Sequence, residues 1–213
     1  LVGSEMCIRD RCTIMAMNFK IFKDAETVAK YTADILRKQL NNNPTSIVGV
    51  HLNEDQAPVL NFLKQDVNRH SVDFSQIHIL DYDKQASFFK SLGVPEKQVH
   101  EVPDDDNVES FIAHHAKTKD NKGKLTLQVL TIDENGQIGL PMNDAVMPAR
   151  EIIVVVTGSN KAAQVQKLYE ENGNTSFIPS TLKTHRMVTV VLDEAAAQGL
   201  PDDVRAYFTS LYA

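Results

Sequence analysis

Hydrophobic positions follow two different spacings along the chain, and the two spacings alternate. Apolar residues three and four positions apart predict helices at residues 24–41, 55–70, 85–92, 107–117, 160–171 and 202–211. Short and nearly continuous apolar runs predict strands at residues 46–52, 77–80, 125–132, 152–156 and 188–192. Asp24 stands just before the first helix and is suited to be its N-cap.

Strands that alternate with helices predict an α/β protein with a mostly parallel sheet, because parallel neighbours need helical crossovers. The run from Ile152 to Val156 has no polar position, which is typical of a strand buried on both faces. In open sheets of this kind, ligands bind beyond the carboxyl ends of the strands. The residues that follow each predicted strand are therefore the first candidates for chemistry.

Composition narrows the classes of function. The chain has 213 residues, a formal charge of −6 and 42% hydrophobic residues, which fits one domain with a sizeable core. Clustered Lys and Arg are needed to neutralise nucleic-acid phosphates, and no basic block is present. No apolar run approaches the ~20 residues that span a bilayer. We expect neither a nucleic acid nor a membrane as partner.

The first residues differ in character from the rest. Residues 1–11, LVGSEMCIRDR, resemble a translated sequencing adapter and lack the apolar core of a signal peptide. We expect residues 1–16 to be an artefactual or disordered tail, the natural chain to start at Met15 or Met17, and residues 17–213 to form one domain. Cys7 and Cys12 then fall outside it, which removes thiol chemistry and fits a reducing, cytoplasmic compartment.

The histidines give no sign of a metal centre. His114 and His115 are adjacent on a predicted helix and point apart, and no pair has the spacing of known zinc motifs. No histidine is assigned to a site, and neither a metal nor another cofactor is expected.

The segment after the strand at 152–156 carries the best signal for a binding site. Gly158 permits close backbone approach, Thr157 and Ser159 offer hydroxyl groups, and a helix N-terminus follows. Lys161 adds a compact positive charge suited to a phosphate. The alternative is that Ser159 or Asn160 serves as an ordinary helix cap.

Acidic residues follow the strand at 77–80. Asp81 and Asp83 are two positions apart and share a strand face, so their carboxylates can converge. Such a pair raises one pKa and can make a general base. The alternative is that both are solvated and that Asp83 caps the next helix.

After the strand at 46–52, the absence of glycine favours Asp55 as a helix cap over an anion site.

A polar segment follows the strand at 125–132. Asn135, Gly136 and Gln137 either reach over a ligand or form a tight turn, since Asn-Gly is a strong turn signal.

The order of elements, the stretch Thr157 to Ala162 and the closing segment Ile178 to Ala196 resemble the glucosamine-6-phosphate deaminase/isomerase family. The related 6-phosphogluconolactonases share the fold and part of the pattern. The resemblance implies a Rossmann-like three-layer α/β/α domain and a sugar-phosphate substrate of amino-sugar metabolism. It also implies that Asp83 shuttles a proton between C1 and C2 and that Lys161 contacts the phosphate.

Other positions depart from the family pattern. Leu52, Asn53 and Glu54 replace the family's Thr-Gly-Ser phosphate loop, Gln137 replaces the His that assists ring opening, and Met142 replaces the Glu that orients it. The segment with a phosphate-binding Arg is missing. Loss of one acid–base group costs about 10²–10⁴-fold in rate. We therefore expect weak or lost catalysis; the alternative is a non-catalytic sugar-phosphate sensor or an interaction paralogue. A homo-oligomer is left open.

Overall fold

The computed structural model describes residues 17–102, 117–118, 121–122, 125–171 and 176–211. The expected tail at 1–16 and most of the expected helix at 107–117 lie outside these residues. Lys117, the last residue of that expected helix, belongs to a strand instead: β5 (Lys117–Thr118) pairs antiparallel with β6 (Asn121–Lys122).

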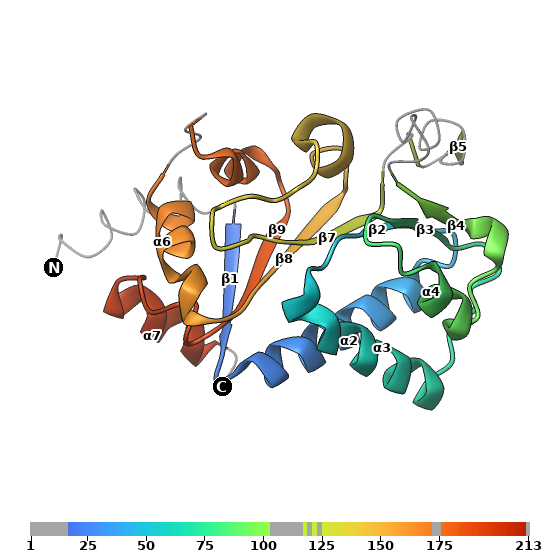
Figure 1. Cartoon of the computed structure of the whole chain (residues 1–213), viewed down its shortest axis with the longest axis horizontal. Coiled ribbons are helices and arrows are strands. Elements are labelled where there is room, and N and C mark those ends of the chain that lie inside the picture. The colour runs from blue at the N-terminus through green and yellow to red at the C-terminus, as the bar shows by residue number, and fades with distance from the viewer. Residues whose placement is uncertain (1–16, 103–116, 119–120, 123–124, 172–175, 212–213) are drawn as a thin grey trace, which may run out of the picture.

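A seven-stranded sheet runs through the centre of the molecule in the order β1-β9-β8-β7-β2-β3-β4, and every pairing within it is parallel (Figure 1). The strands are β1 (Met17–Phe22), β2 (Ile47–Val50), β3 (His78–Asp81), β4 (Val99–Glu101), β7 (Leu127–Thr131), β8 (Glu151–Val156) and β9 (Val188–Asp193). The predicted parallel α/β sheet is confirmed.

Helices connect the strands. The α-helices are α2 (Ala25–Asn42), α3 (Ala57–Arg69), α4 (Ala86–Leu92), α6 (Ala162–Glu170) and α7 (Asp202–Ser210). Short 3-10 turns are η1 (Glu54–Gln56), η2 (Glu96–Gln98), η4 (Ser159–Lys161) and η5 (Ile178–Thr184), and η3 (Met142–Val146) is a π-helical turn. The Asp24 carboxylate accepts the Thr27 N–H at 2.8 Å, so the predicted N-cap of α2 is confirmed.

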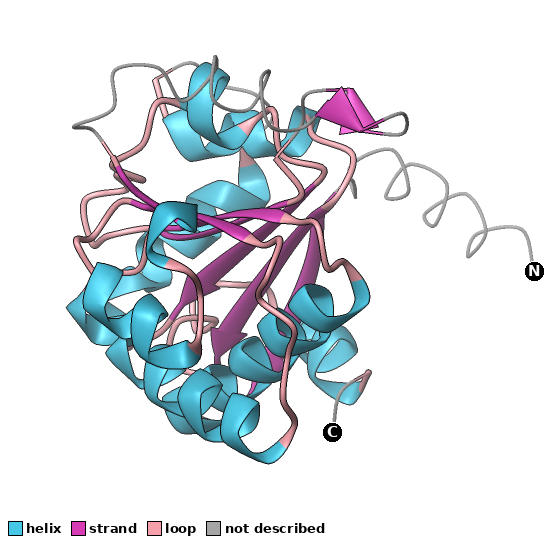
Figure 2. Ribbon diagram, turned by 90° about the vertical axis from the view of Figure 1, so that its right-hand side faces the viewer, coloured by secondary structure: helices cyan, strands magenta, loops and turns pink. Residues whose placement is uncertain are grey.

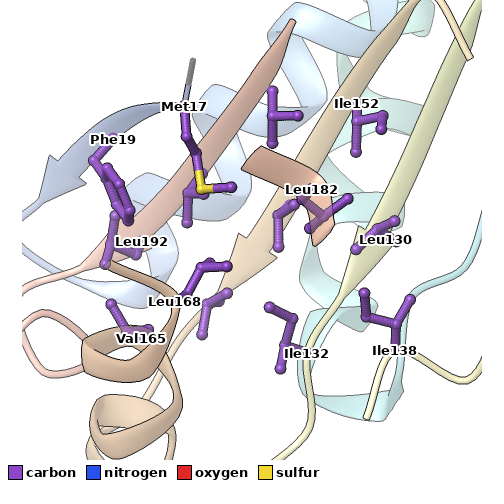
Figure 3. Packing of buried hydrophobic residues seen from close by; sticks show 14 of the residues in the cluster. Met17, Phe19, Leu130, Ile132, Ile138, Ile152, Val165, Leu168, Leu182 and Leu192 are labelled. Carbon is purple, nitrogen blue, oxygen red and sulfur yellow. The ribbon is translucent and has the colours of Figure 1, made fainter. Parts of the chain in front are cut away.

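Two hydrophobic clusters cover the two faces of the sheet. Helices α2, α3 and α4 bury one face, while α6, α7 and the segment after β7 bury the other (Figures 1 and 2). Figure 3 shows the second cluster, where side chains from the strands meet Val165 and Leu168 of α6. Strands β7 and β8 are buried almost throughout, as their nearly continuous apolar runs predict. The sheet and the helices on its two faces therefore form a three-layer α/β/α architecture.

Two strands of the seven-stranded sheet were not predicted from the sequence. Strand β1 lies at the sheet edge, pairs with β9 from Met17 opposite Val188, and buries only alternate residues (Met17, Phe19 and Ile21). That alternation is the ordinary pattern of a strand with one covered face. Strand β4 has three residues, which is too short for a period to show.

The strand order reverses between β2 and β7. From β2 the chain moves outward to β3 and β4, and from β7 it moves the other way to β8 and β9. Ligands of open parallel sheets bind beyond the carboxyl ends at such a switch point. The loops after β2, β3, β7 and β8 meet in this region.

Candidate functional site

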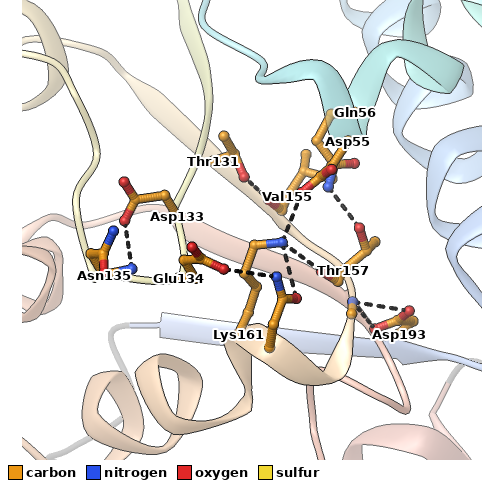
Figure 4. A network of polar contacts seen from close by, with 12 residues as sticks. Asp55, Gln56, Thr131, Asp133, Glu134, Asn135, Val155, Thr157, Lys161 and Asp193 are labelled. Carbon is orange, nitrogen blue, oxygen red and sulfur yellow. Dashed lines mark hydrogen bonds and ion pairs between the residues drawn. The ribbon is translucent and has the colours of Figure 1, made fainter.

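Lys161 is a buried, positively charged residue at the edge of the sheet where the strands have their carboxyl ends. Its side chain is 4% exposed, and its ammonium donates to Asp55 Oδ2 at 3.0 Å, Thr157 O at 3.1 Å and Asn160 Oδ1 at 3.3 Å (Figure 4). Asp55 is 58% exposed. The expectation that Asp55 caps the next helix is wrong: it makes no cap bond in η1 or α3 and neutralises Lys161 instead.

The loop after β8 is held by side chains from neighbouring strands. The Thr157 hydroxyl accepts from Gln56 Nε2 at 2.8 Å, and both residues are buried. Gly158 has φ of 95° and donates its N–H to the Asp193 carboxylate at 3.1 Å. A glycine is required there because other residues rarely adopt that backbone conformation.

The predicted caps of α6 are not found. Helix α6 starts without a side-chain cap: Ser159 is exposed, and Asn160 turns to Lys161 and to Glu134 of the loop after β7. Asn160 Nδ2 lies 3.4 Å from Glu134 Oε2, and Gln164 Nε2 donates to Glu134 O at 2.9 Å. These bonds tie the loops after β7 and β8 together.

The loop after β7 forms a tight turn. Gly136 N–H donates to Asp133 O at 3.1 Å with φ of 78° at Gly136, and Asp133 N–H donates to Gln137 O at 3.0 Å. The predicted turn is confirmed, although it does not join two antiparallel strands, because the next strand, β8, pairs parallel with β7. Asn135 and Gln137 are exposed, and both of their N–H groups donate to the Asp133 carboxylate.

Asp83 lies at the end of β3 and faces the loop after β2. Its Oδ1 is 2.8 Å from His51 Nδ1, and its Oδ2 accepts the Leu52 N–H at 2.7 Å. The alternative in which Asp83 is solvated and caps α4 is wrong, because its side chain is only 18% exposed and α4 starts without a side-chain cap. Asp83 therefore pairs with a histidine rather than with Asp81.

Asp81 and its neighbours carry buried polar atoms with no hydrogen-bond partner. These atoms are Asp81 Oδ2, Tyr82 Oη and Asn53 Oδ1. Burial raises the pKa of Asp81 above that of an ordinary aspartate, and the Asp83 charge adds to the effect. Burial also raises the pKa of Tyr82 to about 12. Unpaired buried groups are rare in proteins, and their gathering at two adjacent strand ends marks this edge as specialised.

The structure brings the predicted residues together in two groups. Thr157 and Lys161 contact the loop after β2 through Gln56 and Asp55, with Gly158 between them in the chain. Asp83 contacts the same loop through His51 and Leu52. The six residues from His51 to Gln56 thus join both groups. Asn135 and Gln137 sit at the rim, with Glu134 as their link to Asn160.

Sequence reasoning missed His51. No histidine was assigned to a site from the sequence, and the structure places His51 beside Asp83. The sequence feature that could have identified His51 is its position directly after β2. Strands β2 and β3 are neighbours in the sheet, so the residues that follow them lie side by side. The Tyr82 N–H donates to Val50 O at 3.3 Å, which keeps the two strand ends in contact.

In the part of the chain that the structure describes, no group of three His, Cys, Asp or Glu side chains is placed to hold a metal ion. No helix in the same residues is long and apolar enough to cross a membrane.

Sequence comparison finds related enzymes over most of the chain. A glucosamine-6-phosphate deaminase of Thermoanaerobacter sp. (strain X514) is 20% identical over 236 residues, covering 84% of this chain and 93% of the relative. One from Geobacillus sp. (strain WCH70) is 22% identical, covering 86% and 96%. Both alignments are longer than the whole chain, so these relatives carry residues that it lacks. No protein-family model matches.

Solved structures share the fold. A monomeric glucosamine-6-phosphate deaminase superposes with a TM-score of 0.64 at 18% identity, covering 86% of this chain and 100% of that one. A 6-phosphogluconolactonase from Trypanosoma cruzi gives 0.68 at 12% identity, covering 86% and 96%. The fold is that of the deaminase/6-phosphogluconolactonase class. The sequence relatives support, within that class, the resemblance to the glucosamine-6-phosphate deaminases.

Proposed function

We propose that this protein binds a sugar phosphate of the glucosamine-6-phosphate type at the carboxyl edge between β2 and β8, and that it catalyses deamination weakly. The observation that carries the proposal is the Lys161 ammonium, fixed at the switch-point edge by Thr157 O and Asn160 Oδ1. Its third partner, Asp55, is a largely exposed side chain that can rotate into solvent. The class of ligand is inferred from the related glucosamine-6-phosphate deaminases.

A phosphate is expected to bind by displacing Asp55 from Lys161. In this proposal the sugar then extends towards Asp83, with the hydroxyls of Thr157 and Ser159, the backbone of Gly158 and the loop of Asn135, Gly136 and Gln137 around it. The displaced carboxylate competes with the ligand, and the nearby Glu134 adds to the acidic surroundings. Both effects favour weak binding of an anion.

Weak catalysis follows from the missing acid–base groups. An amide at Gln137 does not transfer protons near neutral pH, and Met142 offers neither an acid nor a base. Asp83 remains as a carboxylate at the site. The alternative, a non-catalytic sugar-phosphate sensor, is favoured by the full engagement of both Asp83 oxygens.

The test compares three ligands by calorimetric titration of the full chain: glucosamine-6-phosphate, glucosamine and inorganic phosphate. We expect saturable binding of glucosamine-6-phosphate and weaker binding of the other two, because only the first spans both groups of residues. An ammonia-release assay on the same sample measures turnover. Equal affinity for glucosamine and glucosamine-6-phosphate, or no binding of any, contradicts the proposal. Binding without ammonia release supports the sensor.

A further inference from the structure

His51 and Asp83 form a hydrogen-bonded pair at the switch-point edge. Their facing atoms are 2.8 Å apart, and the two side chains keep 22% and 18% of their surface exposed. Both side chains are therefore largely screened from water and still partly accessible. The rings of His51 and Tyr82 meet edge to face, with centroids 6.1 Å apart.

The two Asp83 oxygens have different partners. Oδ2 accepts the Leu52 N–H, which fixes the carboxylate against the loop, and Oδ1 meets His51 Nδ1. A carboxylate accepts protons and an N–H donates them, so this contact favours the tautomer with the proton on Nδ1. Nε2 then carries the lone pair.

The opposite ring nitrogen points towards the loop after β7. A Cβ placed on Gly139 would lie 3.0 Å from His51 Nε2, and Gly139 has φ of 77°. The glycine thus allows the backbone to pass close to Nε2 without a side chain that would block it. The nitrogen with the lone pair lies at the boundary between β2 and β7, where the fold binds ligands.

We propose that His51 Nε2 is the atom that takes the proton from the sugar, and that Asp83 is a positioning residue that holds the ring and its tautomer. This inference rests on the proposed function and refines the role of Asp83 within it. An imidazole transfers protons near neutral pH. A general base that is oriented by a hydrogen-bonded carboxylate is a common arrangement in catalytic sites.

The step is a proton transfer at carbon. The C2–H bond of the open-chain amino sugar breaks, its proton bonds to Nε2, and its electron pair forms the C1=C2 double bond. The C1=O1 π pair moves to O1, which takes a proton from a water molecule and leaves hydroxide. Return of a proton from Nε2 to C2, with loss of the O1 proton to that hydroxide, restores the sugar. Transfer of that proton to C1 instead is the isomerisation step: the C1=C2 pair forms the new C1–H bond, and the nitrogen lone pair forms a C2=N iminium. The hydroxide left from water then adds to C2.

The experiment follows this step without requiring complete turnover. Glucosamine-6-phosphate is incubated with the full chain in D₂O, and NMR measures the loss of the C2 proton signal. We expect His51→Ala to lower the exchange rate by about 10²–10⁴-fold. Added imidazole is expected to restore exchange in His51→Ala and not in Asp83→Ala. His70→Gln, at an exposed histidine after α3, is the matched control and should exchange at the wild-type rate.

A ligand-free measurement tests the positioning role. Nitrogen NMR of the histidine rings should show His51 protonated on Nδ1 in the wild type, with that preference lost in Asp83→Asn. Calorimetry on each variant shows whether binding survives. Binding by the wild type without C2 exchange overturns this inference and supports the non-catalytic sensor, whereas absence of binding by the wild type overturns the proposed function. C2 exchange that persists at the wild-type rate in His51→Ala overturns this inference and leaves the proposed function standing. A proton on His51 Nε2 in the wild type overturns the inference in the same way.

Discussion

The Lys161 ammonium lies 3.0 Å from Asp55 Oδ2, and the two side chains differ sharply in exposure, at 4% and 58%. A buried ammonium is costly unless its charge is matched, so Asp55 stabilises the unliganded site. An exposed carboxylate is also easily displaced, because water can solvate it. In the proposed function, the contact that balances Lys161 is therefore the one that an anionic ligand replaces.

The Thr157 hydroxyl gives a prediction about stability. It accepts from the buried Gln56 amide at 2.8 Å, so Thr157→Val leaves a buried donor without an acceptor. We expect the free energy of unfolding to fall by about 1–3 kcal/mol, measured by urea denaturation. Thr157→Ser keeps the hydroxyl and serves as the control. Equal stability of Thr157→Val and Thr157→Ser contradicts the hydrogen bond.

Gly49 gives a prediction about packing in the sheet. It is opposite Gln128 in the pairing of β2 and β7, and a Cβ on Gly49 would lie 2.0 Å from Gln128 Oε1. Gly49→Ala forces this fully buried side chain to move and should destabilise the protein by about 1–3 kcal/mol. The double variant Gly49→Ala/Gln128→Ala should lose less stability than the sum of its single variants. Additive losses in a denaturation cycle contradict the clash.

Asp81 gives a prediction about pH. Burial raises its pKa above the value in the unfolded chain, so between those two values the folded state binds more protons. Stability contributed by Asp81 is present below the unfolded pKa and is lost as pH rises through the folded pKa. Urea denaturation from acid to neutral pH should show the Asp81→Asn variant gaining stability relative to wild type as pH rises.

Asp73 is the matched control for that experiment, because its pKa is shifted in the opposite direction to that of Asp81. Hydrogen bonds from Ser75 lower the pKa of Asp73, so its contribution is present above the unfolded pKa and is lost as pH falls through the folded pKa. Asp73→Asn should therefore lose stability relative to wild type as pH rises. The same pH trend in both variants contradicts the burial argument for Asp81.

Much of the fold could be predicted from the sequence because its central strands are buried on both faces. The run from Ile152 to Val156 and the helical spacing around Val28 and Leu36 leave little ambiguity. Strand β1 was missed because it alternates buried and more exposed residues, instead of forming the near-continuous apolar run from which the central strands were predicted. Strand β4 was missed because three residues show no period.

The site was harder to predict because its contacts join residues far apart in the chain. Asp55 and Lys161 are 106 positions apart, and His51 and Asp83 are 32 apart. Local rules assigned Asp55 and Asp83 to helix caps, since an acidic residue before a helix usually serves as one. The order of strands in the sheet decides otherwise, and that order is a property of the whole chain rather than of a local pattern.

The central claim is that Lys161 is the phosphate anchor and that Asp55 is its displaceable counter-ion. The most direct measurement titrates glucosamine-6-phosphate into wild type, Asp55→Asn, Lys161→Met and Glu54→Gln. Removal of Asp55 should tighten binding about tenfold, equivalent to 1.4 kcal/mol. Lys161→Met should abolish binding, while Glu54→Gln, which removes the neighbouring exposed charge, should change it less than Asp55→Asn does. Unchanged affinity in Lys161→Met, or equal effects of Asp55→Asn and Glu54→Gln, would contradict the account.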